Sequence, residues 1–161
     1  AYEIPKRDWS SDVCSSDLLA KARHAARESG MAALADDSGI CVPALGGAPG
    51  VFSARYAGEP KSDVANNARL VRELQSHEDK SAYYHCVLVY LRHADDPQPV
   101  IAEGGWKGEI IAEARGQGGF GYDPHFWLPS LGKTAAELAP EEKNLLSHRG
   151  QALRALLARL A

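Results

Sequence analysis

The stretch Ala33–Ile40, "ALADDSGI", decides how the rest of the chain is interpreted, because an apolar run ends there on two adjacent carboxylates. Asp36 and Asp37 are followed by a serine and a glycine, residue types that favour turns. One interpretation is a strand, Met31–Ala35, that stops in a polar turn. The other is a metal or proton-transfer site at the carboxyl end of a strand, where α/β folds gather their ligands. The stretch alone favours the turn.

The composition bounds the class of protein. A chain of 161 residues with 45% hydrophobic and 24% charged residues is typical of a single globular domain. The formal net charge of -3 provides no basic field for a nucleic-acid backbone, so we expect no nucleic acid as partner. The charge does not exclude binding of a free nucleotide. No apolar run approaches the roughly 18 residues of a membrane span and no signal-peptide pattern opens the chain, so no membrane partner is expected.

The cysteines indicate a reducing compartment. Cys14, Cys41 and Cys86 are scattered without C-x-x-C spacing, which suggests neither a zinc site nor a disulfide framework. We therefore expect a cytoplasmic protein.

Helical periodicity predicts two helices in the first half of the chain. One covers Leu18–Ser29 and is closed by Gly30, and the other covers Ser62–Gln75 with its first residue as N-cap. The apolar face expected for the second helix consists of Val64, Ala68, Val71 and Leu74. The segment before the first helix has no clear period, and its serine and aspartate density is typical of a loop.

Strand signals follow in the middle of the chain. Residues 83–91, "YYHCVLVYL", have the apolar and β-branched character of a buried strand. Residues 100–111, "VIAEGGWKGEII", are interpreted as two strands around glycine turns, with a bulge at Gly104 and Gly105 as the alternative. Strands interleaved with helices, plus an antiparallel pair, predict a three-layer α/β/α domain on a mixed sheet.

The C-terminal third predicts capped helices. Thr134 and Glu137 form a capping-box pair, and Gly150 is a candidate break between two later helices. An apolar stripe is expected from Leu145, Leu146, Leu153, Leu156, Leu157 and Leu160.

A glycine-rich loop at 116–126, "GQGGFGYDPHF", is a candidate base-binding site. Its glycines match neither the P-loop pattern nor the dinucleotide-binding one. Phe120 lies between two glycines, so its ring has a free face that could stack a purine, worth roughly 1–3 kcal/mol. Asp123 could accept a hydrogen bond from a ring N–H. The alternative, which the loop alone slightly favours, is a tight turn with Phe120 in the core.

A third cluster is "EEKNLLSHRG", residues 141–150. Lys143, His148 and Arg149 place three donors near expected helix starts, where backbone N–H groups also attract anions. Taken singly, His148 is typical of a surface or hydrogen-bonded histidine, and Lys143 of a solvated helix face.

Together these motifs resemble one enzyme family. From Leu19 to Leu160 the chain is similar to the inosine/xanthosine triphosphate pyrophosphatases, also called the Ham1 family. The matching blocks are "AKARHAA", "ADDSGI", "LGGAPGVFSARYAG", "GGFGYDP", "GKTAAEL" and "EEKNLLSHRGQAL". The resemblance implies Mg²⁺-dependent hydrolysis of dITP, ITP and XTP to the monophosphate and pyrophosphate, by a homodimer. Two alternatives are a nucleotide-binding module without catalysis and a Maf-like pyrophosphatase. The blocks "GGFGYDP" and "SHRGQAL" argue poorly for the Maf-like alternative.

The resemblance also implies roles for individual residues. Asp37 matches the catalytic proton acceptor, and Asp37 with Asp36 matches the metal-binding acidic cluster. Mg²⁺ prefers one or two carboxylates together with waters and phosphate oxygens, which suits such a cluster beside a triphosphate. The implied substrate-binding residues are Ser38, Phe120, Gly121, Tyr122, Asp123, Lys143, His148, Arg149 and, for the phosphates, Lys21.

The first 18 residues depart from the family. Residues 12–18, "DVCSSDL", resemble the translation of a sequencing-adapter oligonucleotide, and the family's [S/T]-x-N-x-x-K phosphate loop and its leading strand are missing. Ser16, Asp17 and Leu18 stand where the family reads E-N-A. We therefore expect a non-native segment at 1–18 and a truncated pyrophosphatase domain at 19–161. Such a chain is expected to fold poorly or associate through a sheet edge, and to turn over slowly.

Overall fold

The computed structural model describes residues 12–161 of the chain, with four α-helices and one five-stranded sheet in this range. The helices are α1 (Asp12–Ser29), α2 (Asp63–Leu74), α3 (Pro140–Leu146) and α4 (His148–Leu160). The strands are β1 (Ala33–Cys41), β2 (Ser81–Leu91), β3 (Val100–Ile110), β4 (Phe126–Leu128) and β5 (Lys133–Thr134). Short 3₁₀ turns are η1 (Pro43–Leu45), η2 (Gly50–Arg55), η3 (Asp123–His125) and η4 (Ala135–Glu137).

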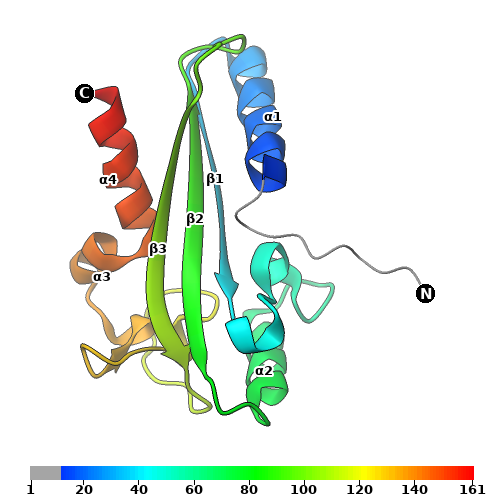
Figure 1. Ribbon diagram of the computed structural model, residues 1–161, viewed down its shortest axis with the longest axis vertical. Helices are drawn as coiled ribbons and strands as arrows, with labels where there is room; N and C mark the ends of the chain where they lie inside the picture. The colour runs from blue at the N-terminus through cyan, green and yellow to red at the C-terminus, as the bar shows by residue number, and fades with distance from the viewer. Residues whose placement is uncertain (1–11) are drawn as a thin grey trace.

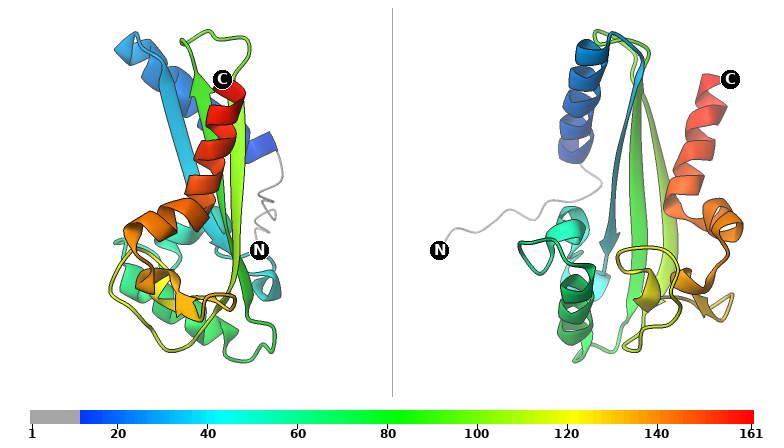
Figure 2. Two further views of the ribbon diagram at one scale, coloured as in Figure 1. Left: turned by 90° about the vertical axis from the view of Figure 1, so that its left-hand side faces the viewer. Right: turned by 180° about the vertical axis from the view of Figure 1, so that it is seen from behind.

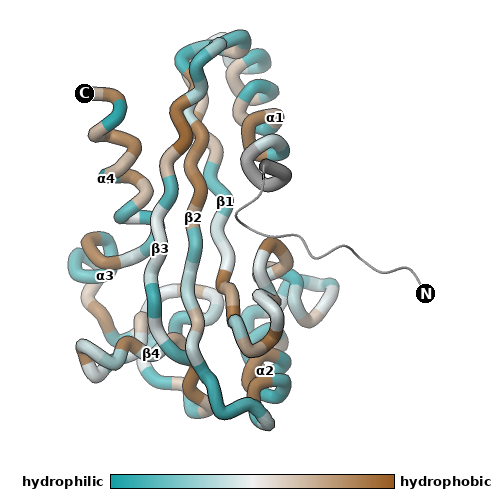
Figure 3. The backbone as a smooth tube through the Cα atoms, viewed as in Figure 1, coloured by the Kyte–Doolittle hydropathy of each residue, from teal (hydrophilic) through white to brown (hydrophobic). Residues whose placement is uncertain are grey.

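The sheet lies between two helices, so the expected three-layer α/β/α arrangement is confirmed. Helix α1 packs on β1 and β2, whereas α4 packs on β2 and β3 from the opposite face (Figures 1 and 2). Leu18 and Ala22 of α1 lie against one face with Val87 and Val89, and Ala152 and Leu156 of α4 lie against the other with Cys86 and Leu88. The upper half of β2, where these apolar residues lie, is its most hydrophobic part (Figure 3). Both faces of this strand are therefore buried.

The described sheet is antiparallel throughout, which differs from the mixed sheet expected. Its strands follow the order β1-β2-β3-β4-β5, and every pairing runs antiparallel. A helix between two strands normally returns the chain for a parallel pairing. Here α2 lies beyond the carboxyl end of β1 rather than along the sheet face, so β2 starts at that same end and runs back (Figure 1).

The acidic pair lies inside a strand, which corrects the strand end expected at residue 35. β1 continues through Asp36 and Asp37 to Cys41, and these two aspartates pair with Leu88 and Val87 of β2. The strand continues because β2 is long enough to hydrogen-bond along its whole length, and this tertiary pairing overrides the local turn preference of the sequence.

Residues 100–110 form one uninterrupted strand, so the prediction of two strands around glycine turns is wrong. Gly104 is required there for close packing rather than for a turn. A Cβ at this position would lie 2.1 Å from the backbone oxygen of His148 and 2.6 Å from the backbone nitrogen of Ala152. The glycine therefore lets α4 lie directly on the sheet.

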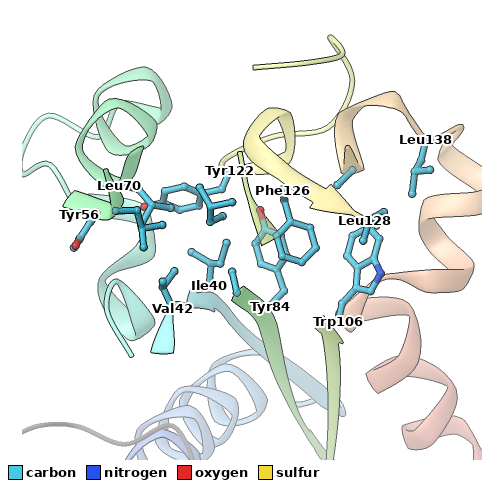
Figure 4. Packing of buried hydrophobic residues seen from close by; sticks show 14 residues of the cluster. Ile40, Val42, Tyr56, Leu70, Tyr84, Trp106, Tyr122, Phe126, Leu128 and Leu138 are labelled. Atoms are coloured by element: carbon cyan, nitrogen blue, oxygen red, sulfur yellow. The ribbon is translucent and has the colours of Figure 1, made fainter. Parts of the chain in front are cut away.

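A second core fills the lower end of the molecule, below the α1 and α4 layers. It gathers Ile40, Tyr84, Trp106, Tyr122 and Phe126 from strands and loops that are distant in sequence (Figure 4). Aromatic contacts hold it together, since the ring of Tyr84 lies 4.7 Å from that of Phe126 in an edge-on arrangement. This core supports the loops that carry the candidate site.

Helix α2 is confirmed with Ser62 as its N-cap, whose side chain accepts a hydrogen bond from the Ala65 N–H. Its buried face differs from the expected one. The buried residues are Asn66, Asn67, Leu70 and Leu74, whereas Val64 is 82% exposed. Two asparagines face inward because they hydrogen-bond to loops that pack against the helix, a role that apolar periodicity cannot reveal.

The C-terminal helices break at Ser147 instead of Gly150. The Ser147 side chain accepts from the Gly150 N–H and so caps α4. The capping box of Thr134 and Glu137 is present and opens η4. Of the expected leucine stripe only Leu156 is buried. The leucines that remain exposed are Leu145, Leu146, Leu153, Leu157 and Leu160.

Helix α1 starts at Asp12, so residues 12–17 are helical rather than a loop. Gly30 closes the helix as expected, with its N–H donating to the Ala26 oxygen. Leu18 is buried at the expected domain boundary, and the helix runs through that boundary unbroken. Residues 1–11, which belong to the segment expected to be non-native, lie outside the described residues. In the part of the chain from residue 12 onward, no helix is long and apolar enough to cross a membrane.

Candidate functional site

Strand β1 presents its acidic pair to opposite faces of the sheet. Side chains alternate along a strand, so Asp36 lies on the face of α4, with Cys86, while Asp37 lies on the face of α1, with Val87. In the described part of the chain β1 is an edge strand. A ligand that passes around this edge therefore meets both aspartates, although one compact ion cannot easily be held by both.

Asp36 is engaged by Arg149, the second residue of α4. The guanidinium donates to both carboxylate oxygens, at 2.7 and 2.8 Å, and also to the Ser38 hydroxyl at 3.3 Å. Burial alone would raise the pKa of Asp36, but the hydrogen bonds and charge of Arg149 outweigh it and the pKa lies below its usual value. This pairing joins the middle of β1 to the start of α4.

Phe120 is exposed at the tip of the glycine-rich loop, so the interpretation that buries it in the core is wrong. The residue is 62% exposed. The ammonium of Lys143 lies 4.6 Å from the ring centroid and the guanidinium of Arg149 lies 5.9 Å from it. An exposed aromatic ring beside two cations is a suitable surface for a base that carries a polyphosphate.

Asp123 organises this loop from within. It is 3% exposed, and its carboxylate accepts from the Phe120 N–H at 2.8 Å and the Tyr84 hydroxyl at 3.3 Å. It also forms an ion pair with Lys143. A Cβ on Gly119 would lie 2.1 Å from this carboxylate, so only glycine fits beside it. Both carboxylate oxygens thus have partners inside the protein, and Asp123 shapes the loop that is expected to bind the base.

Gly121 and Tyr122 are also held by residues that sequence reasoning missed. The Gly121 N–H donates to Asp63 and its carbonyl accepts from Asn67, both on α2. The Tyr122 hydroxyl donates to the backbone oxygen of Ser53 at 2.7 Å, and the tyrosine is 4% exposed. The one signal that could have indicated these partners is the pair of asparagines at positions where an amphipathic helix would carry apolar residues.

His148 begins α4 and is 6% exposed. Its ring stacks on Tyr84 at 4.7 Å with an angle of 8° between the planes. Burial, together with the nearby charge of Arg149, lowers its pKa to about 4, so the imidazole is neutral at pH 7. Its Nδ1 is buried without a hydrogen-bond partner among residues 12–161. A buried, unsatisfied ring nitrogen is costly unless a ligand completes it.

Two cavities flank Phe120 and His148. One of about 270 Å³ extends between β1, α2 and the glycine-rich loop, and its lining includes Ser38, Asp63 and Gly121. The other, of about 400 Å³, adds Lys143 and Arg149. A larger cavity of about 760 Å³ lies elsewhere, between α2 and the end of β3, and none of the expected site residues lines it. We assign the site to the first two cavities because the polar groups converge there.

The structure brings most of the expected site residues together but leaves two apart. Lys21 lies on α1, on the opposite side of the sheet from Arg149, and forms an ion pair with Asp17 at 3.6 Å. Asp37 lies on the same face of the sheet as α1. Among the residues described, no group of three or more histidine, cysteine, aspartate or glutamate side chains is arranged to hold a metal ion. A single carboxylate still fits Mg²⁺, which takes its remaining ligands from water and phosphate.

Comparison with known proteins identifies the family. The model of the Ham1 family matches residues 14–159, which is most of the chain. The chain belongs to the Ham1 family. A Ham1 protein from Coxiella burnetii has the same fold, with a TM-score of 0.87 and 46% sequence identity over 98% of this chain and 81% of that one.

Curated relatives in the Ham1 family share this sequence closely. The dITP/XTP pyrophosphatase of Ralstonia nicotianae is 66% identical over 160 residues, which cover 98% of this chain and 80% of the relative. The dITP/XTP pyrophosphatase of Nitrosomonas europaea is 68% identical over 145 residues, covering 90% of this chain and 71% of the relative. The Ham1 protein of Staphylococcus aureus has a TM-score of 0.84 at 41% identity, over 91% of this chain and 75% of that one.

Proposed function

We propose that this chain is a nucleoside triphosphate pyrophosphatase that hydrolyses deaminated purine nucleotides, dITP, ITP and XTP, to the monophosphate and pyrophosphate. The observation that carries the proposal is the exposed Phe120 ring between two cavities, bordered by the buried imidazole of His148 and by the cations Lys143 and Arg149. The names of the close relatives support the same activity. Ser38, Gly121, Tyr122 and Asp123 line or shape the same pocket.

In this proposal the purine stacks on Phe120, and His148 donates a hydrogen bond to its 6-oxo group. A neutral imidazole can donate from its unpartnered nitrogen to an oxo acceptor. The 6-amino group of adenine is itself a donor, so adenine would leave this buried donor unpaired at a cost of roughly 1–3 kcal/mol. Arg149 and Lys143 would meet the sugar–phosphate side of the nucleotide, and Lys21 would meet the phosphates from the face of α1.

Asp37 is the proposed proton acceptor. Water attacks the α-phosphorus, the bond from this phosphorus to the bridging oxygen breaks, and pyrophosphate leaves. Asp37 takes a proton from the attacking water as the new P–O bond forms. Its place at the sheet edge, on the face opposite Asp36, suits a triphosphate that passes around β1 from the base pocket.

Mg²⁺ is the proposed cofactor, with Asp37 as its protein ligand. Bound there, the ion would orient the triphosphate and offset the negative charge that develops on the leaving pyrophosphate. Asp36 forms an ion pair with Arg149. It would support the acidic cluster indirectly, by holding Arg149 in the lining of the pocket. The remaining proposals are a homodimer and a cytoplasmic location, the latter supported by the buried cysteines Cys41 and Cys86, which are not disulfide-bonded.

The test is pyrophosphate release from dITP with Mg²⁺ by the parent chain and by the Asp37→Asn variant. Loss of a general base lowers kcat by about 10²–10⁴-fold. The matched control is Asp95→Asn, which removes an exposed carboxylate paired with Arg27 at the opposite end of the sheet, and should stay within about two-fold of the parent. Parent-like release by Asp37→Asn would show that this residue is not the proton acceptor.

A further inference from the structure

The backbone of the glycine-rich loop is fastened to α2. We propose that Asp63 and Asn67 form a clamp on Gly121 that positions Phe120 for stacking on the base. This inference rests on the proposed function, because it assigns a purpose to the position of that ring. The two residues are called the α2 clamp below.

The clamp uses both backbone polar groups of Gly121. Asp63 Oδ2 accepts from the Gly121 N–H at 2.9 Å, and Asn67 Nδ2 donates to the Gly121 carbonyl at 2.8 Å. The first bond fixes the peptide unit that joins Phe120 to Gly121, and the second fixes the unit that follows. Phe120 is 62% exposed, so side-chain packing contributes little to the position of its ring. Its position therefore depends on the backbone, which is held by Asp123 at the Phe120 N–H and by the clamp at Gly121.

The clamp is itself rigid. Asp63 and Asn67 are four residues apart, so they lie one above the other on the same face of α2. Asn67 is 8% exposed, and its amide also donates to the main-chain oxygen of Asp63 at 2.9 Å. Asp63 is in the first helical turn, where the helix dipole favours a negative charge. Leu70 and Leu74 anchor the same helix in the lower core.

The clamp acts on the base-binding loop, so its loss should weaken binding of the base. The other contacts of the loop, from Tyr122 to Ser53 and from Lys143 to Asp123, remain when Asp63 is changed. These contacts, together with the bond from the Phe120 N–H to Asp123, hold the loop on both sides of the tip. The peptide unit between Phe120 and Gly121 is the part that loses its partner on α2, so the direction of the Phe120 ring is what changes. Uniform weakening of ground-state and transition-state binding raises KM without lowering kcat.

The experiment is calorimetric titration of dIMP, the expected product, into the full chain and its variants. Because dIMP binding needs no turnover, the result does not depend on catalysis. We expect Asp63→Ala to raise the Kd about ten-fold, since it removes a charge-assisted hydrogen bond, and Asp63→Asn to recover most of the affinity by keeping an acceptor in place. Asn67→Ala should also weaken binding. Ser62→Ala, which removes the cap of the same helix without touching the loop, should stay within about two-fold of the parent.

An NMR measurement distinguishes the loss of the clamp's hydrogen bond from a general loss of stability. In the NMR spectrum, the Gly121 amide proton should lose the downfield position typical of a hydrogen bond to a carboxylate in Asp63→Ala, and keep it in Ser62→Ala. If the parent binds dIMP and the Asp63→Ala variant binds it with equal affinity, the clamp is overturned while the proposed function stands. If Ser62→Ala weakens binding as much as Asp63→Ala, the effect is one of helix stability and the clamp is again overturned. A parent that does not bind dIMP overturns the proposed function and the clamp with it.

Discussion

At the scale of single residues, the burial of His148 makes stability depend on pH. Its pKa is lowered to about 4 by burial and by Arg149, against about 6.5 in an unfolded chain. Between these two values the unfolded state binds the extra proton, so the free energy of unfolding falls as the pH drops from 6.5 towards 4. The loss amounts to about 3 kcal/mol at most.

The measurement is urea unfolding of the parent and of His148→Gln at several pH values between 7 and 4.5. The parent should lose stability steadily below pH 6.5, and the variant should show a flatter profile because glutamine does not titrate. His24→Gln, on an exposed histidine of α1, serves as the control and should keep the slope of the parent. Equal slopes in the parent and His148→Gln would contradict the account of this buried imidazole.

The candidate site residues Phe120, Lys143, His148 and Arg149 were predictable through the family resemblance, because Lys143 and His148 taken singly look like ordinary surface or core residues. The structure places all four around the same two cavities. The internal role of Asp123 was not predictable, because a carboxylate has the same appearance in a sequence whether it faces a ligand or a backbone N–H. The contacts from α2 to Gly121 were also missed. They depend on residues more than 50 positions apart, and no local pattern encodes such a distance.

At the scale of elements, the fit of α4 against β3 depends on Gly104. Gly104→Ala should destabilise the fold by about 1–3 kcal/mol, because the added methyl group would meet backbone atoms of α4 that cannot rotate away. The neighbouring Gly105→Ala is the matched control, since its Cβ would lie 3.9 Å from the nearest atom, the Tyr84 oxygen. Urea unfolding of both variants gives the comparison, and equal free energies of unfolding would contradict the packing argument.

Elements with a local signal were predicted well, and those decided by pairing were not. α2 was found from its N-cap at Ser62, and η4 from its capping box. β1 was cut short because its acidic residues favour turns locally, whereas the long strand β2 pairs with them in the fold. The glycines of β3 predict a turn locally, whereas Gly104 in the fold allows close contact with α4. Local propensity fails at these positions because neighbouring elements decide the conformation.

At the scale of the whole molecule, β1 forms an edge of the sheet. In the range from residue 12 onward it pairs with β2 on one side, and on the other side one bridge joins Cys41 to Pro49. Leu34 on this strand is 51% exposed. Unpaired strand edges with apolar side chains favour association between chains. We therefore expect the isolated chain to form species larger than one chain as its concentration rises.

Sedimentation velocity over a range of concentrations tests this expectation. Leu34→Lys should reduce the larger species, because a charge on an edge strand opposes strand addition. Leu157→Lys, on the exposed face of α4, is a control of equal chemistry and should leave association unchanged. If Leu157→Lys reduced the larger species and Leu34→Lys did not, the edge of β1 would be ruled out as the surface through which the chains associate.

The most direct test of the proposed activity is pyrophosphate release from dITP, XTP, dATP and dGTP, with and without Mg²⁺. It compares this chain with a version whose first 18 residues are replaced by the corresponding segment of the Ralstonia nicotianae relative. We predict Mg²⁺-dependent release from dITP and XTP, faster in the replaced version, with dATP slower by about ten-fold or more because its 6-amino group meets a donor. No release from dITP or XTP by either protein, or equal rates with dATP, would contradict the account.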